Sequence, residues 1–424
     1  MKSRFSGRAK KEITLWSGLG QLSTTLLGTG LFMIPAIAAG IAGEASLWAW
    51  LILFVAVIPI ALTFAALGKR YPSAGGTAYF VRKAFGQRME RSVGWLFLSV
   101  TPVGIPAGVA LAGSFGKQLL PTPLDNTLLA ELITIGLLVM VNLMGSKSSA
   151  RIQTVIALAI CALVSLFWVY GDVSTADIKM PVLTSDSILP IASALGVMFW
   201  CFVGIEAFAH MGEEFKKPET DFPIAIILGC LFAGAIYWSC SVVILKFHAY
   251  GTEELAAGSI PWISEQIFGS KGAILISLIG YFACFASLNL YIQSLSRMAF
   301  AIAKNSHPNA KMAVISKRGV PAYATLTISA ILVICSFIGE VLGIDLEALV
   351  KLANGVFVLV YLLAMLSAYK LLTGMNKVLS LTALVITMLV FACLGWASLY
   401  AIAVLFSVHF LRNGSKLLLV ASKK

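Results

Sequence analysis

The sequence is built from apolar runs of about 20 residues that follow one another along almost the whole chain. A run of this length lets an α-helix cross the hydrocarbon core of a bilayer. Hydrophobic residues make up 59% of the 424 residues and charged residues only 12%, about half the charged share of a typical soluble domain. The sequence therefore predicts an all-α protein that crosses a membrane many times.

Twelve apolar runs each predict one transmembrane helix. The runs lie at 13–41, 46–68, 90–116, 125–145, 152–170, 188–212, 222–246, 272–303, 322–339, 345–369, 378–393 and 395–411. The first run follows a basic segment, as in a signal peptide, but it is too long for one and lacks a small-residue cleavage site before further apolar sequence. We therefore expect it to be retained as the first helix.

The basic residues are distributed unevenly between the predicted loops. The 31 Lys and Arg residues against 19 Asp and Glu residues give a net charge of +12. If the N-terminus lies in the cytoplasm, all but five of the Lys and Arg residues fall on the cytoplasmic side. Such an excess is the usual signature of membrane topology. The charge thus predicts that both termini are cytoplasmic, and it does not require a nucleic-acid partner.

Motifs of common enzyme and metal sites are absent from the sequence. It has no GxxxxGK(S/T) phosphate loop, no GxSxG, no HExxH, and no GxGxxG after a strand. The four histidines have no metal-ligand spacing, and all seven cysteines fall in predicted spans, where cysteine usually acts as a small apolar residue. We therefore expect no enzyme, no cofactor, no metal site and no disulfide framework.

The first predicted helix contains the run LLGTGLFMIP, from Leu26 to Pro35, which is unfavourable for a continuous helix. Gly28 and Gly30 allow unusual dihedral angles, and Pro35 lacks a backbone N–H. Unpaired backbone groups are tolerated in a membrane only where they line a cavity or meet a ligand. A close-packed helix crossing with a proline kink explains this run equally well when it is considered alone.

The sixth predicted helix has a second interruption, in the run GVMFWCFVGIEAFAH. Gly204 lies in mid-span, and Glu206 is the one acidic residue that we place in the middle of a span. A buried carboxylate in a membrane suggests function, although a structural tie between helices is the alternative. Interrupted helices at matching positions of two five-helix halves predict a secondary transporter with an inverted repeat.

The two interruptions suggest a zwitterionic substrate. The N-terminus of a half-helix offers free N–H groups to an anion, and unwound carbonyls face a cation. We expect Thr29 and Gly30 to provide donors to a carboxylate, and carbonyl groups near Leu26 to accept from an ammonium group. An amino acid carries both groups.

Four motifs resemble the amino acid–polyamine–organocation transporter superfamily, and the resemblance covers essentially the whole chain. They are LLGTGLFMIP, RYPSAGGTAYFVRKAFG at 70–86, EEFKKPETDFPIAI at 213–226, and SRMAFAIAKNSHP at 296–308. Within the superfamily, VMFWCFVGIEAFAH and YFACFASLNLYIQS look most like bacterial exporters of L-methionine and branched-chain amino acids. The segment at Gly75–Phe80 is interpreted as a gate-forming loop, with a simple re-entrant turn as the alternative.

The resemblance implies a LeuT-like fold with two five-helix inverted repeats and broken helices 1 and 6. The transport core would span 1–370, with repeats at about 13–170 and 188–370, and 371–424 would hold two peripheral helices and a basic cytoplasmic tail. The implied function is alternating-access, proton-coupled export of methionine, leucine, isoleucine and valine from a bacterial cytoplasm, as a monomer or weak homodimer. Where some proton-coupled members carry a lysine in helix 5, this chain has Ala159 and Ile160, so the coupling ion stays open.

The resemblance also implies a set of site residues. The substrate backbone would be held by Leu26, Thr29, Gly30, Trp200, Cys201, Val203 and Gly204. Phe97, Thr101 and Tyr291 would face the pocket or its gates, and Glu206 is the candidate for proton coupling or gating. Ordinary apolar packing is the alternative for Phe97 and Thr101.

This implied pocket has no charged side chain at its side-chain end, which favours neutral amino acids over arginine, lysine and glutamate. The main alternative function is an uptake permease or an amino acid/amine exchanger of the same superfamily. A channel or a transport-accessory subunit is the alternative from another class of protein.

Overall fold

The computed structural model describes residues 13–71, 76–121, 123–145, 150–176, 178–208, 215–217, 219–306 and 308–411. Within these ranges the regular structure is helical, apart from an isolated parallel bridge between Ile13 and Phe215. The prediction of an all-α chain is confirmed for these residues. The predicted basic tail after Leu411 lies outside them.

The main helices follow the predicted apolar runs closely. They are α1 (Leu15–Leu27), α2 (Gly30–Ala42), α3 (Ser46–Arg70), α4 (Gly76–Phe85), α5 (Gln87–Leu98), α6 (Gly104–Leu119), α7 (Thr127–Met144), α8 (Ala150–Tyr170), α9 (Ser185–Met198), α10 (Ile205–Phe208), α11 (Asp221–Lys246), α12 (Glu253–Ser306), α13 (Ala322–Leu342), α14 (Leu346–Leu371), α15 (Met375–Cys393) and α16 (Ser398–Phe406). Among the described residues, eight helical stretches are long and apolar enough to cross a membrane. The finer division into twelve spans stays a prediction.

Two segments outside the predicted spans are helical. The expected gate-forming loop is helix α4 from Gly76 onward, and its Thr77 and Phe80 side chains are fully buried. Helix α12 consists of two helices that meet at Gly269, where φ is 67°. Its first part carries Glu253 and Glu254 in the first turn. Because these charges interrupt the apolar sequence, the apolar runs do not predict this helix.

The predicted helix at 90–116 is wrong in one respect, because it is divided into α5 and α6. Residues 99–103 form turns between the two helices. Pro102 and Pro106 have no N–H to donate, so a continuous helix would lose hydrogen bonds here. The carbonyl of Ser99, which the division exposes, accepts a hydrogen bond of 2.7 Å from the hydroxyl of Tyr400 on α16.

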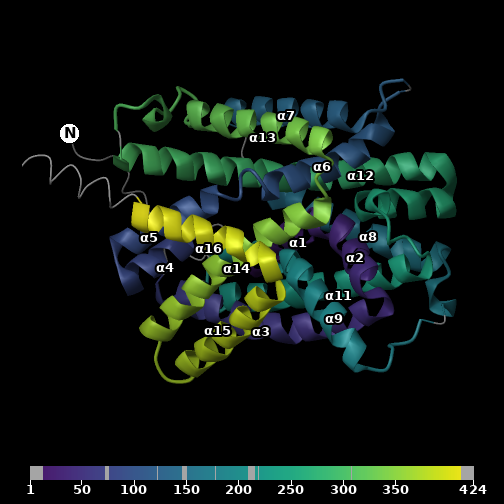
Figure 1. Cartoon of the computed structure of the whole chain (residues 1–424), viewed down its shortest axis with the longest axis horizontal. Helices are drawn as coiled ribbons and strands as arrows, with labels where there is room; N and C mark the ends of the chain where they lie inside the picture. Colours follow the sequence, from purple (N-terminus) through teal and green to yellow (C-terminus); the bar gives the residue numbers. More distant parts are fainter. Residues whose placement is uncertain are drawn as a thin grey trace, which may run out of the picture.

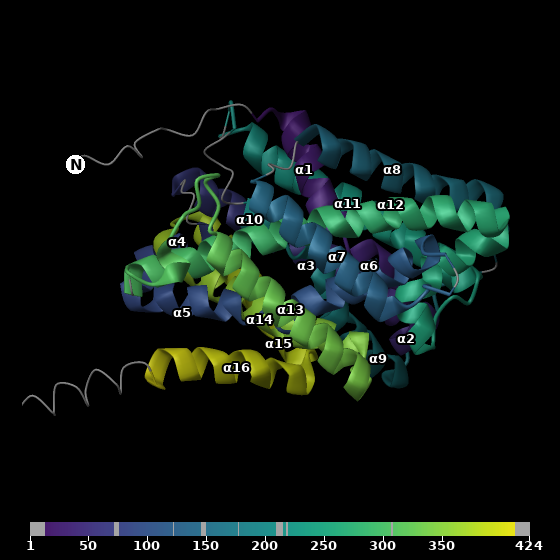
Figure 2. The same cartoon turned by 90° about the horizontal axis from the view of Figure 1, so that it is seen from above.

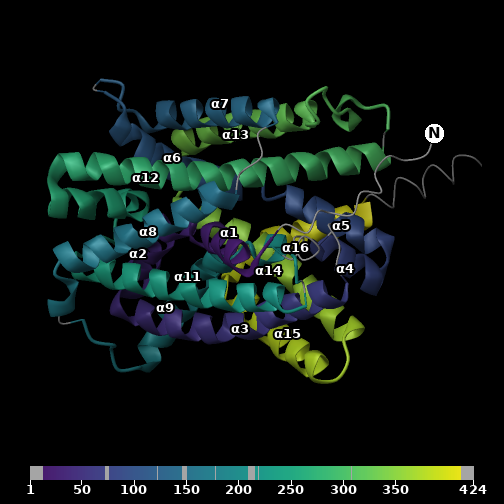
Figure 3. The same ribbon diagram turned by 180° about the vertical axis from the view of Figure 1, so that it is seen from behind.

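The helices form two groups that enclose the candidate site. Helices α7 and α13 lie side by side along one edge, next to α12 and α6 (Figure 1). The second group contains α1 and α2 packed against α11 and α9, with α3 beside them, as the view from behind shows (Figure 3). Helices α15 and α16 pack on α14, and α16 lies at the outer edge of the molecule (Figure 2). A peripheral role for the last two helices stays a prediction.

The beginning of α1 is fastened to the segment that precedes α11. The backbone N–H of Lys216 donates to the carbonyl of Ile13 over 2.8 Å. The ring of Phe215 packs against Gly18, where an added Cβ would lie 2.5 Å from it, and it meets Phe222 edge-on at 5.5 Å. These contacts join the start of α1 to the segment before α11 and to the first turn of α11.

Candidate functional site

The first predicted interruption is present between α1 and α2. Helix α1 ends at Leu27, α2 begins at Gly30, and Gly28 has φ −17° and ψ −115°, far from helical values. The freed carbonyl of Leu26 accepts a 2.7 Å hydrogen bond from the hydroxyl of Tyr237 on α11. A side chain at Gly30 would overlap that hydroxyl and would lie 3.3 Å from the indole of Trp200. A glycine is therefore required here by the close approach of α11.

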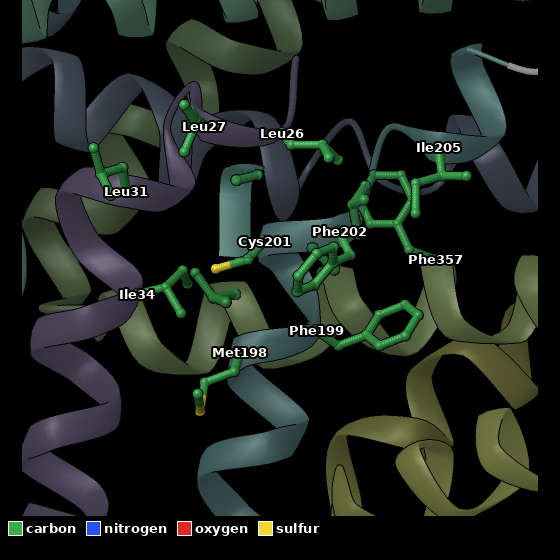
Figure 4. Packing of buried hydrophobic residues seen from close by; sticks show 14 of the residues in the cluster. Leu26, Leu27, Leu31, Ile34, Met198, Phe199, Cys201, Phe202, Ile205 and Phe357 are labelled. Carbon is green, nitrogen blue, oxygen red and sulfur yellow. The ribbon is translucent and has the colours of Figure 1, made fainter. Parts of the chain in front are cut away.

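The second predicted interruption lies between α9 and α10. Helix α9 ends at Met198, a 3₁₀ turn covers Phe199–Phe202, and α10 begins at Ile205. Gly204 has φ 126°, which side chains rarely adopt, and an added Cβ would come within 2.6 Å of Thr25. Figure 4 shows the two interruptions facing each other, with Leu26 and Leu27 of α1 on one side of Phe202 and Cys201.

Glu206 is held inside the second interruption by neighbouring polar groups. Its side chain is 2% exposed, and one carboxylate oxygen accepts a 2.8 Å hydrogen bond from the N–H of Gly204. The same oxygen contacts the hydroxyl of Tyr361 on α14, which also lies 2.9 Å from the carbonyl of Phe202. A tyrosine hydroxyl has one proton, so these two acceptors compete for it. The geometry matches the structural tie that the sequence left as an alternative.

A small cavity lies between the two helix groups and next to both interruptions. It is lined by Thr29, Val100, Gly104, Ile105, Gly108, Trp200, Leu288, Tyr291 and Phe357. The indole N–H of Trp200 donates to the hydroxyl of Thr29 over 3.3 Å, which links the two broken helices. The cavity has room for about one water molecule. An amino acid therefore needs the two helix groups to move apart before it can enter.

The structure brings some of the predicted site residues together and separates others. Thr29, Trp200 and Tyr291 line the cavity. Leu26, Gly30, Val203 and Gly204 form the interruptions beside it. Cys201 is fully buried beside the hydroxyl of Tyr237 and does not line the cavity. Phe97 packs against Phe357 with ring centroids 6.3 Å apart, and Thr101 is buried in the turn after α5, so neither lines the cavity.

Several residues around the site were missed by the sequence analysis. They are Val100, Gly104, Ile105 and Gly108 near the α5–α6 turn, Leu288 on α12, Phe357 and Tyr361 on α14, and Tyr237 on α11. The run TPVGIPAG, from Thr101 to Gly108, has two glycines like the first interruption and one more proline, and this composition is a signal for the break between α5 and α6. The two tyrosines have no local signal, because they act on helices far away in sequence.

Comparison with known proteins gives consistent matches over most of the chain. The family model described as amino acid permease matches residues 13–419. The L-methionine/branched-chain amino acid exporter of Escherichia coli (strain K12) is 47% identical over 396 residues, which cover 93% of this chain and 94% of that protein. An uncharacterized amino acid permease of Bacillus subtilis (strain 168) is 28% identical over 405 residues, 92% of this chain and 93% of that protein. The cadaverine/lysine antiporter of E. coli (strain K12) is 25% identical over 330 residues, 73% and 71% of the two chains.

The Glu206 contacts predict how two substitutions differ in stability. Glu206→Ala leaves the buried N–H of Gly204 without its acceptor, which costs about 1–3 kcal/mol. Glu206→Gln keeps a side-chain oxygen that can accept the hydrogen bond from Gly204, so its loss of stability should be much smaller. We expect the thermal unfolding midpoint in detergent to fall clearly for the alanine variant and little for the glutamine variant. Equal losses for the two would show that the hydrogen bond to Gly204 does not stabilise the second interruption.

Proposed function

The chain belongs to the amino acid permease family, and on that premise we propose that it is a secondary transporter that exports L-methionine, leucine, isoleucine and valine across a bacterial inner membrane. The observation that carries the proposal is the 47% identity with the E. coli exporter over nearly the full length of both chains. The transported amino acid is then the substrate and, in this proposal, the proton is the coupling ion.

The lining of the cavity supports a neutral, apolar substrate. Its side chains carry no charge, and the polar groups are the hydroxyls of Thr29 and Tyr291 and the indole N–H of Trp200. A charged substrate side chain would lose its hydration there without a partner, at a cost of several kcal/mol. Each methylene of an aliphatic or thioether side chain that becomes buried instead contributes about 0.8 kcal/mol.

The interruptions provide groups for the substrate backbone. The first turn of α2, which begins at Gly30, has N–H groups without intrahelical partners, and these suit a carboxylate. The carbonyls of Leu26 and Phe202 each meet a tyrosine hydroxyl, and a carbonyl oxygen has a second lone pair that can accept from an ammonium group. We propose that Leu26, Thr29, Gly30, Trp200, Val203 and Gly204 hold the substrate backbone, with Tyr291 at its side-chain end.

The proposed architecture is twelve spans with both termini in the cytoplasm. Ten core helices in residues 1–370 would form the two inverted repeats, and 371–424 would be peripheral. In this orientation the contact between Ile13 and Phe215 lies on the cytoplasmic side and must separate before a substrate loads for export. The protein would work as a monomer or a weak homodimer.

Substrate preference can be measured by counterflow in proteoliposomes. We expect labelled methionine and leucine to exchange in a saturable manner, and arginine and glutamate not to exchange. Gly108→Val should abolish exchange, because a Cβ at this position already lies 2.8 Å from Leu288 and 3.6 Å from Thr29. Gly136→Val is the matched control, since Gly136 on α7 has no neighbour within 4 Å of an added Cβ. Preferred exchange of arginine would contradict the apolar pocket.

Transport direction can be measured in cells that express the protein. When the cells are fed a dipeptide containing methionine, we expect less free methionine to accumulate than in cells with an empty vector. The Gly108→Val variant should behave like the empty vector. A rise in intracellular methionine would instead identify an uptake permease. If methionine leaves the cells only when an amino acid is present outside, the protein is an exchanger, like the antiporter relative.

Proton coupling through Glu206 can be tested by the pH dependence of flux. A glutamine cannot change its charge, so Glu206→Gln should flatten the dependence of methionine flux on pH if this carboxyl titrates during transport. Parallel pH profiles for the wild-type protein and the variant would leave Glu206 with its structural role alone.

A further inference from the structure

A second hollow lies where α7 ends, α13 begins and α12 passes between them. It is lined by Asn142, Gly145, Gln293, Ser296, Arg297, Val320, Pro321 and Thr325. Unlike the central cavity, it has a lining of which five of eight residues are polar. Figure 3 shows α7 and α13 running together along the outer edge, next to α12. The hollow is therefore close to the surrounding lipid and separate from the transport site.

Ser296 is the unusual polar residue in this hollow. Its side chain is 1% exposed, and its hydroxyl has no hydrogen-bond partner within the described part of the chain. The buried Ser264 and Ser367 donate to the carbonyl four residues back, whereas Ser296 is one of seven serine hydroxyls of the described residues that are buried without a partner, and it is the one of these seven that lines the hollow. A buried hydroxyl without a partner costs about 1–3 kcal/mol. A ligand oxygen in the hollow would remove this cost.

Two other polar side chains of the hollow, Asn142 and Thr325, are already hydrogen-bonded within the protein. The amide of Asn142 donates to the carbonyl of Leu138 and to the side-chain oxygen of Asn289, at 2.7 and 2.8 Å. The hydroxyl of Thr325 donates to the carbonyl of Pro321 over 3.3 Å. Ser296 therefore offers the hollow a hydroxyl donor that no group of the described residues uses.

The electrostatic surroundings of the hollow favour an anion. The guanidinium of Arg297 is exposed and forms no ion pair with any carboxylate of the described residues. The connection to α13 at 308–321 adds Lys311, Lys317 and Arg318, all exposed, and contains no acidic residue. Helix α13 begins at Ala322 without a side-chain cap, so the positive end of its dipole also faces this region.

The apolar surface beside the hollow identifies the source of the anion. Met140 and Met144 on α7, and Tyr323 and Leu326 on α13, have exposed fractions between 46% and 57%. Large apolar side chains at this exposure on membrane helices face lipid tails. Basic pockets between transmembrane helices bind the head groups of anionic lipids. We propose that this hollow, which has room for one or two water molecules and widens to admit a head group, binds the phosphate of an anionic phospholipid, held by the Arg297 guanidinium and the Ser296 hydroxyl.

The proposal can be tested with the full-length protein in nanodiscs of phosphatidylcholine, to which phosphatidylglycerol is added in steps. We expect phosphatidylglycerol to raise the thermal unfolding midpoint of the wild-type protein. Arg297→Gln should need about tenfold more of this lipid for half of the effect, because it loses a hydrogen bond between charged groups. Arg91→Gln is the matched control, because Arg91 is an exposed arginine on α5 and lines neither hollow.

Ser296→Ala separates a ligand contact from a structural one. In pure phosphatidylcholine the variant should unfold at the same temperature as the wild-type protein or higher, since it loses an unpaired hydroxyl. In phosphatidylglycerol it should gain less stability than the wild-type protein. A lower midpoint of Ser296→Ala in pure phosphatidylcholine would overturn the proposal, as would equal effects of Arg297→Gln and Arg91→Gln. An equal rise with inorganic phosphate alone would overturn the lipid as the source. None of these measurements depends on the transported substrate.

Discussion

The structure depends on the requirement that every backbone N–H and C=O inside a membrane finds a partner. A regular helix meets this requirement by itself, whereas an interrupted helix needs groups from elsewhere. Tyr237 donates to the carbonyl of Leu26. At the second interruption, Tyr361 donates to the carbonyl of Phe202, and Glu206 accepts from the N–H of Gly204. Tyr400 donates to the carbonyl of Ser99 at the third interruption. Each interruption is thus stabilised by a side chain from another helix, which also fixes the packing of those helices.

The sequence reveals where helices are interrupted more readily than what stabilises the interruptions. Gly28, Gly30 and Gly204 show two of the breaks, because glycine is required where φ is unusual or where another helix approaches closely. The break at 99–103 was missed because its apolar residues continue the hydrophobic run, and hydropathy does not register the missing N–H of Pro102. Tyr237, Tyr361 and Tyr400 act across separations of more than 150 residues. Such pairings follow from tertiary packing, which local patterns do not encode.

The predicted site residues fall into two sets: those marked by helix-breaking residues nearby, and those assigned by alignment of motifs. Helix-breaking residues mark the two interruptions in the sequence, and the structure adds a hydrogen bond between Thr29 and Trp200 across them. Phe97, Thr101 and Cys201 were placed by alignment of motifs, and the structure puts them in the packing around the cavity. Whether a buried apolar residue faces a cavity or a neighbouring helix depends on a rotation about the helix axis of a few tens of degrees. Phe97 lies near the end of α5, and Thr101 lies in the turn that divides α5 from α6.

The contacts around the cavity also indicate where it opens. On one side, the hydrogen bond between Trp200 and Thr29 joins the two broken helices. On the other side, Gly104 and Gly108 of α6 face Trp200 and Thr29 of the broken helices through apolar contacts, at 3.6 Å from an added Cβ in each case. Separating apolar surfaces in the presence of a substrate of similar character costs little, because the substrate replaces the contacts that are lost. Breaking the Trp200–Thr29 bond would leave a buried polar group unpaired. The cavity should therefore widen between α6 and the broken helices, and a substrate side chain that enters there replaces the packing of Gly104 and Gly108 against Trp200 and Thr29.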